Sequence, residues 1–263
     1  MTTHVDDPAD AMAQEAGASD GLPTVSVVLP VLNEAAHIEQ VLSRLLAQDY
    51  PRHLVIEILV VDGRSEDGTR DATSQFQHRH PLAGIRLLDN PLRITSAALN
   101  IGIRAARGDV LVRMDGHAIP ATDYVSRCVD ALQRTGAANV GGVVEPVGRT
   151  PFGAAVALAT KHPLGAGDAR YRVGGSAGDV DTVAYGAFRR EVFQDVGLFD
   201  ESMVVNEDYE VNVRIRAAGY RIHFNPSIRL QYTPRGTVGD LWRQYFRYGW
   251  WKVETLRRVP RSL

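Results

Sequence analysis

Short apolar runs that end abruptly in a polar residue recur through the first half of the chain. They cover residues 25–32, 57–61, 85–88, 110–114 and 140–144. Continuous runs of this kind are typical of strands buried on both faces of a parallel sheet. Between them, apolar residues recur at helical spacing over residues 38–46, 96–107 and 124–132. Strands that alternate with helices predict an α/β fold with a mainly parallel, twisted sheet and helices on both faces.

Polar side chains follow four of these runs. They are Asn33 and Glu34, then Asp62, then Asp89 and Asn90, and finally Asp115. One such residue is ordinary in a turn, and Asn33 could also cap the following helix. Four tips are harder to explain in that way, because the carboxyl ends of parallel strands meet at one edge of the sheet. Open α/β sheets bind ligands at that edge, so the sequence predicts a site there.

The fourth tip, Asp115-Gly116-His117, carries side chains that bind metals. An Asp and a His two residues apart can both reach a divalent cation, and the glycine between them allows a ligand to approach the backbone. Mg²⁺ prefers oxygen ligands, whereas Mn²⁺ accepts an imidazole, so His117 favours Mn²⁺ over Mg²⁺. The alternative is an ordinary loop histidine. Arg113, within the strand, receives no role.

The composition excludes several classes of protein. The chain has 263 residues, of which 44% are hydrophobic, which suits one globular domain with or without an embellishment. The net charge of −2 provides no basic field for nucleic acid. The single cysteine, Cys128, allows no disulfide within the chain, fits a reducing cytosol and is expected in the core.

The two ends of the chain have opposite charge. Residues 1–22 predict a disordered acidic tail, and they lack the apolar core of a signal peptide. Residues 239–263 carry six basic and two acidic residues among aromatic ones at helical spacing. This pattern predicts a helix that packs on the domain or lies at a membrane interface. No apolar run is long enough to span a bilayer. We expect a domain of a longer, membrane-associated chain.

The second half of the chain is less regular. Residues 162–181 are rich in glycine and form either a plain linker or a mobile lid. Glu207 and Asp208 begin a predicted helix, where acidic residues complement the helix dipole even without a further role. Residues 30–34 follow the first strand without the Gly-x-Gly-x-x-Gly pattern, which argues against a nucleotide-dependent dehydrogenase.

In their order, these motifs resemble family 2 glycosyltransferases of the GT-A fold. The matching stretches are residues 27–34, 60–69, 98–102, 115, 186–190 and 206–208, within a resemblance that runs from about 23 to 251. Residues 114–118 are most similar to exopolysaccharide transferases of the succinoglycan-biosynthesis type. The resemblance implies a catalytic domain over 23–238, with a donor half at about 23–145 and an acceptor half at 146–238.

The family pattern also assigns roles to residues. Those assigned to donor binding are Pro30, Asn33, Glu34, Asp62, Asn90, Asn100, Asp115, Gly116 and Arg247. A carboxylate such as Asp62 favours a uracil-like edge. Asp115 and His117 would hold the metal, Asp208 would be the base, and Glu207 would orient the site or bind the acceptor. Arg247 would clamp the diphosphate, although Tyr248 replaces the tryptophan of processive relatives.

The resemblance implies an inverting enzyme that transfers a sugar by one displacement. The implied donor is UDP-glucose, and the implied acceptor is a lipid-linked or oligosaccharide chain in exopolysaccharide or cell-envelope glycan synthesis. Such an enzyme would be cytoplasmic and peripheral to, or anchored at, the inner face of the cell membrane. The alternative is a non-catalytic nucleotide-sugar-binding partner of a polysaccharide assembly complex, which the presence of Asp208 disfavours.

Overall fold

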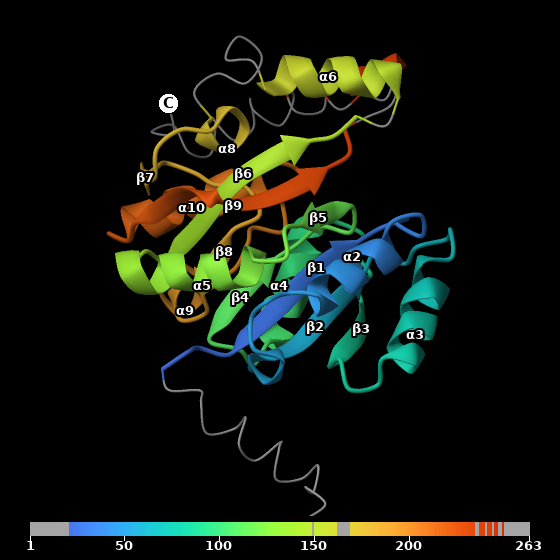
Figure 1. The fold of residues 1–263 in the computed structure, drawn as a ribbon, viewed down its shortest axis with the longest axis horizontal. Helices are drawn as coiled ribbons and strands as arrows, with labels where there is room; N and C mark the ends of the chain where they lie inside the picture. Colours follow the sequence, from blue (N-terminus) through green and yellow to red (C-terminus); the bar gives the residue numbers. More distant parts are fainter. Residues whose placement is uncertain are drawn as a thin grey trace, which may run out of the picture.

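The computed structural model describes residues 21–148, 150–161, 169–234, 237–239, 241–243, 245, 246 and 249. These residues form one nine-stranded sheet with helices on both faces, as predicted (Figure 1). The strands are β1 (Val25–Val31), β2 (Val55–Asp62), β3 (Ile85–Asp89), β4 (Val110–Arg113), β5 (Ala118–Pro120), β6 (Asn139–Pro146), β7 (Gly178–Asp179), β8 (Ala187–Arg189) and β9 (Ile222–Tyr232). The helices are α2 (Ile38–Leu46), α3 (Thr69–Arg79), α4 (Thr95–Ala105), α5 (Tyr124–Thr135), α6 (Pro151–Lys161), α8 (Arg170–Val173), α9 (Val192–Val196) and α10 (Glu207–Ala217), with a 3-10 turn at Arg52–Leu54.

The first half of the sheet has the parallel order β3-β2-β1-β4. All seven residues of β1 are buried, as its continuous apolar run predicts. The register pairs Val31 with Asp62, and Asp62 with Asp89. The polar tips of these strands therefore come to one edge of the sheet.

The second half of the sheet departs from the parallel pattern. The neighbour of β4 is the three-residue β8, which runs antiparallel to both β4 and β6. Strand β9 is then parallel to β6 and antiparallel to β5. The expectation of a mainly parallel sheet thus holds for strands β3, β2, β1 and β4, whereas the rest of the sheet is mixed.

Alternating side chains divide the core between the two faces of the sheet. Val27 and Leu29 of β1 pack in one cluster with α2 and α5, whereas Val28 packs in the other with α4, α9 and α10. Cys128 is fully buried in the first cluster, which confirms it as a core residue, and burial raises the pKa of its thiol. Both faces are covered, so the sheet edge is left to form a site.

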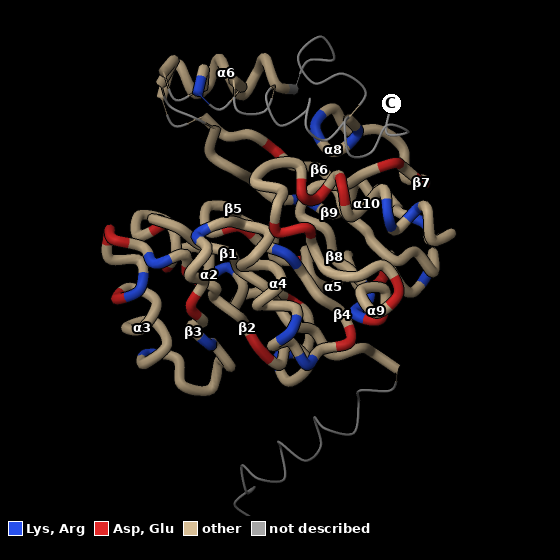
Figure 2. Tube along the Cα trace, turned by 180° about the vertical axis from the view of Figure 1, so that it is seen from behind, with Lys and Arg blue, Asp and Glu red and all other residues tan. Residues whose placement is uncertain are grey.

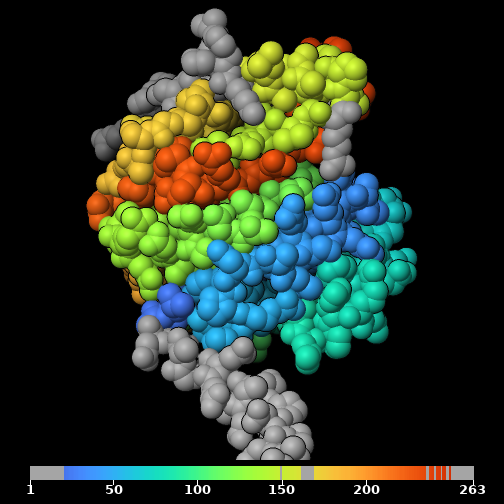
Figure 3. Space-filling model, viewed as in Figure 1, coloured from blue at the N-terminus to red at the C-terminus, as the bar shows by residue number. Residues whose placement is uncertain are grey.

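The chain crosses the molecule in successive bands. In Figure 3 the blue and cyan residues of the first strands lie on one side, the green residues follow, and the yellow and orange residues lie on the other side. Basic and acidic positions are interspersed over the coloured part of Figure 2. None of the helices formed by described residues is long and apolar enough to cross a membrane. Residues 1–20 of the predicted acidic tail and most of residues 239–263 lie outside the described residues.

Candidate active site

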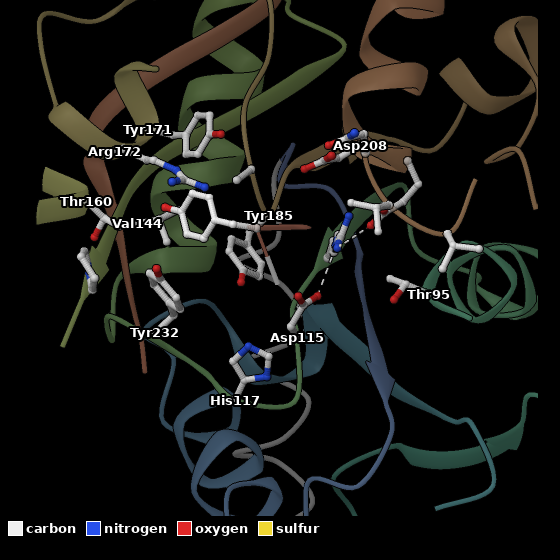
Figure 4. Close-up of a pocket in the computed structure, with 18 of the residues that line it drawn as sticks. Thr95, Asp115, His117, Val144, Thr160, Tyr171, Arg172, Tyr185, Asp208 and Tyr232 are labelled. Atoms are coloured by element: carbon white, nitrogen blue, oxygen red, sulfur yellow. Dashed lines mark hydrogen bonds and ion pairs between the residues drawn. The ribbon is translucent and has the colours of Figure 1, made fainter. Parts of the chain in front are cut away.

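Two cavities meet at the strand tips. The small cavity, of about 140 Å³, is lined by residues of the donor half that include Pro30, Glu34, Gly63, Asn90 and Gly116. The wide cavity, of about 680 Å³, is lined mainly by residues of the second half of the chain. Thr95, Asp115 and His117 line both cavities, and Figure 4 labels all three beside the wide one. The Asp115-Gly116-His117 segment therefore lies where the cavities join.

Two buried acceptor oxygens lack a hydrogen-bond donor near the small cavity. Asp62 is fully buried and lines neither cavity, although the next residue, Gly63, lines the small one. Its Oδ2 accepts from Arg70 Nη1 at 2.9 Å and from the Ser65 N–H at 3.1 Å, while its Oδ1 has no partner among the described residues. Asn90 donates from Nδ2 to the Ile94 carbonyl at 3.0 Å, and its Oδ1 also has no partner. Buried oxygens are seldom left unsatisfied, so each of these two atoms requires a donor from water or from a ligand.

The side chains of Asn33 and Asn100 make hydrogen bonds within the protein away from the two cavities. Asn33 adopts a left-handed φ of 56°, and its Oδ1 accepts from the Glu66 N–H at 2.9 Å, so it shapes a turn and does not cap α2. Asn100 is paired with the backbone of Phe199, donating to its carbonyl at 2.8 Å and accepting from its N–H at 2.9 Å. Neither asparagine lines the two cavities, so the structure does not bring them to the candidate site.

Gly116 is required by its neighbours in the protein. A Cβ at this position would lie 2.7 Å from Glu34 Cγ and 2.9 Å from Val31 Cγ1. The sequence predicted that a ligand approaches the backbone at Gly116. The side chains of Glu34 and Val31 instead fill the space where a Cβ of Gly116 would lie. The close approach lets Glu34 Oε1 reach Nδ1 of His117 at 2.7 Å.

Asp115 and His117 are the two residues at the junction that the sequence predicts as metal ligands. The described residues contain no group of three or more His, Cys, Asp or Glu that could hold a metal, so a cation at this place would need further ligands from outside the protein. Histidines that bind metals usually donate their second ring N–H to a carboxylate, and Glu34 occupies that position on His117. A diphosphate would supply the remaining oxygens.

Arg113 is the site residue that the sequence analysis missed. Its Nε donates to Asp115 Oδ1 at 3.3 Å and its Nη2 donates to Glu207 Oε1 at 3.0 Å. Burial alone would lower the pKa of Arg113, but Asp115 and Glu207 outweigh it and raise that pKa. The available signal was an arginine inside an apolar strand, because a buried charge needs a partner.

The acidic pair at the start of α10 divides between two environments. Glu207 is 8% exposed, and burial raises its pKa, against the lowering effect of Arg113 and with a further increase from Asp208. Asp208 is half-buried, lines the wide cavity and accepts from the Tyr209 N–H at 2.8 Å. Both residues line the wide cavity, but Glu207 is paired with Arg113. Arg247 lies outside the described residues.

Replacing Arg113 with methionine should destabilise the fold, because Glu207 would stay buried opposite an apolar side chain. We expect Arg113→Met to lower the free energy of unfolding by about 3–5 kcal/mol, measured by urea denaturation. The double change Arg113→Met/Glu207→Gln should recover most of that loss. Arg79→Met, which removes an exposed ion pair with Glu39, is the control and should cost less than about 1 kcal/mol. A double variant that loses the sum of both single effects would contradict the pairing.

Comparisons with known proteins agree with this geometry. Residues 26–197 match the family model described as Glycosyl transferase family 2. The succinoglycan biosynthesis protein ExoA of Rhizobium meliloti (strain 1021) is 37% identical over 235 residues, covering 88% of this chain and 70% of ExoA. A dolichyl N-acetyl-alpha-D-glucosaminyl phosphate 3-beta-D-2,3-diacetamido-2,3-dideoxy-beta-D-glucuronosyltransferase of Methanococcus voltae is 28% identical over 231 residues, covering 86% and 71%.

A solved structure supports the same assignment. The mannosyltransferase PcManGT from Pyrobaculum calidifontis, in complex with GDP-Man and Mn²⁺, superposes with a TM-score of 0.65 at 26% identity. The match covers 85% of this chain and 61% of that one, so the present chain spans about three fifths of its length. The chain belongs to glycosyltransferase family 2 and has the GT-A fold.

Proposed function

We propose that this glycosyltransferase moves a hexose from a nucleotide-sugar, whose nucleoside lies at the small cavity, to an acceptor in the wide one. The observation that carries the proposal is the junction of the two cavities at Asp115 and His117. A donor whose diphosphate lies at this junction would present its anomeric carbon to the wide cavity. Asp208 lines only the wide cavity, the side from which an acceptor hydroxyl would approach.

The donor we propose is UDP-glucose. Asn90 in the small cavity and Asp62 beside Gly63 each have an Oδ1 acceptor without a partner among the described residues, and one of the two suits the single N3–H group of uracil. Pro30 lines the same cavity and would flank the nucleoside. The choice of glucose rests on the resemblance to succinoglycan-type transferases and on the identity to ExoA.

The metal we propose is Mn²⁺, or Mg²⁺ in its place, bound by Asp115 and His117. Glu34 holds the imidazole of His117 through its 2.7 Å contact, which would fix the orientation of the ring. A cation at this point would offset the charge that develops on the departing diphosphate. The Mn²⁺ in the mannosyltransferase structure supports this choice.

The base we propose is Asp208. Its carboxylate would take the proton of the acceptor hydroxyl while the hydroxyl oxygen attacks the anomeric carbon and the bond from that carbon to the diphosphate breaks. One displacement of this kind inverts the anomeric configuration. Glu207 accepts from Arg113, which fits an orienting role better than contact with the acceptor. Arg113 would then hold both Asp115 and the start of α10 in place.

The acceptor we propose is a lipid-linked saccharide at a membrane surface. Trp242 and Phe246 are 65% and 62% exposed, and their rings stack with centroids 5.3 Å apart. Exposed aromatic rings beside basic residues are typical of segments that lie at a membrane interface. This supports the role predicted for the C-terminal segment.

Mn²⁺ should tighten UDP binding, and Asp115→Ala should abolish that gain because it removes the anionic ligand. Glu34→Gln should weaken Mn²⁺ binding by about 10- to 100-fold, as expected when the partner of a metal-binding histidine is lost. Both effects are measured by titration calorimetry with Mn²⁺ and with EDTA. Glu39→Gln, an exposed carboxylate away from both cavities, is the control. Identical UDP titrations with and without Mn²⁺ would contradict the metal site.

Asp208→Asn should lower the transfer rate by roughly 10²- to 10⁴-fold, because it keeps the size of the side chain and removes the proton acceptor. UDP and Mn²⁺ affinity should stay unchanged, since Asp208 does not line the small cavity. Asp181→Asn, exposed and outside both cavities, is the control. Near-normal transfer by Asp208→Asn would refute the base assignment. Donor binding without transfer by the unmutated chain to any acceptor would favour the non-catalytic alternative.

Trp242→Ser/Phe246→Ser should weaken co-sedimentation with vesicles that contain anionic lipid, because the change removes the exposed aromatic pair. Binding by the unmutated chain should also fall as salt screens the basic residues. Leu82→Ser replaces another exposed apolar side chain, 95% exposed between α3 and β3, and should have no effect. Equal co-sedimentation of all three proteins would mean that the aromatic pair has no part in membrane binding.

A further inference from the structure

One wall of the wide cavity has a composition that the proposed reaction does not require. Tyr171 and Arg172 reach it from the short helix α8, Tyr232 from the end of β9, and Tyr185 from the segment before β8. Figure 4 shows Tyr171 and Arg172 on the side of the cavity away from Thr95. The wall therefore combines several tyrosine rings with one guanidinium, at a place separate from the small cavity.

The two arginines that line the wide cavity differ in how their charge is balanced. Arg113 is matched by Asp115 and Glu207. Arg172 is partly buried, and no carboxylate of the described residues lies within ion-pair distance of it. Its guanidinium carbon instead lies 5.6 Å from the centre of the Tyr171 ring. Because arginine does not lose its proton in proteins, Arg172 keeps a positive charge that no carboxylate of the described residues pairs with directly.

A cation withdrawn from water without a counter-charge is costly, so an anion that enters the cavity is favoured at this point. The surrounding tyrosines suit a sugar, since their apolar ring faces allow a sugar ring to stack on them. The planar guanidinium binds two oxygens of a phosphate or a carboxylate at once. A donor diphosphate is a poorer candidate, because Arg172 does not line the small cavity.

We propose that Tyr171, Arg172, Tyr185 and Tyr232 form an acceptor subsite for a saccharide that carries an anionic group, with Arg172 on the anion. The anion is a phosphate or a carboxylate attached to the acceptor. This proposal rests on the proposed function, because it assigns the wide cavity to the acceptor. It adds a selectivity for charged over neutral acceptors that the base and the metal site do not provide.

The test compares Arg172→Gln with the unmutated chain and with Arg170→Gln. Arg170 lies on the same helix, does not line the cavity and donates to the Ser176 carbonyl, so it is a matched control. Saturating UDP and Mn²⁺ are present throughout, so that phosphate groups cannot bind in the donor cavity. The probes are hexose 1-phosphates, hexuronic acids and methyl hexosides of the gluco, galacto and manno series, titrated by calorimetry.

In the unmutated chain and in Arg170→Gln, at least one anionic series should bind about 10- to 100-fold more tightly than its neutral methyl hexoside. Arg172→Gln should lose that difference, with unchanged UDP affinity and unchanged thermal unfolding. Preference for the 1-phosphates identifies a phosphate group, and preference for the hexuronic acids identifies a carboxylate.

Equal binding of charged and neutral sugars, no binding of any of them, or an intact preference in Arg172→Gln would each overturn the subsite. All of these outcomes are measured by sugar titration and do not depend on transfer activity. Failure of the proposed function would instead appear as loss of UDP binding or of transfer by the unmutated chain. The two failures are therefore distinguishable.

Discussion

The arrangement of the site depends on one buried guanidinium. Arg113 donates to Asp115 at the tip of its own strand and to Glu207, 94 residues further along the chain. A buried arginine is tolerated only with its charge matched, so the fold must bring both carboxylates to it. The ion pair between Arg113 and Glu207 therefore holds the first turn of α10 against the end of β4. Asp208, the next residue of that turn, then faces the wide cavity.

Much of the donor half could be predicted from local patterns. The run at 25–32 became β1, and the tips of neighbouring strands meet because a parallel register pairs Val31 with Asp62 and Asp62 with Asp89. The acceptor half could not be predicted in this way. Strand β8 has three residues, too few for a periodic pattern, and its position beside β4 is fixed by pairing across the chain.

The sequence predicted some residues of the candidate site but not their partners, because these contacts join positions far apart in the chain. His117 and Glu34 stood out as polar residues at strand tips, but their 2.7 Å contact joins positions 83 residues apart. Asn100 belongs to a motif of the family, yet its amide is held by Phe199, and nothing near it in the sequence indicates that partner. The type of a residue suggests the chemistry it can perform. Which residue it contacts depends on the tertiary structure.

The central claim is that donor and acceptor meet at Asp115 and His117. The most direct measurement is a crystal structure of the chain with UDP and Mn²⁺, with the metal located by its anomalous scattering. The account predicts the uracil in the small cavity near Asp62 and Asn90, an anomalous peak between Asp115 and His117, and the wide cavity left open for the acceptor. A nucleotide bound in the wide cavity, or a peak away from both residues, would contradict it.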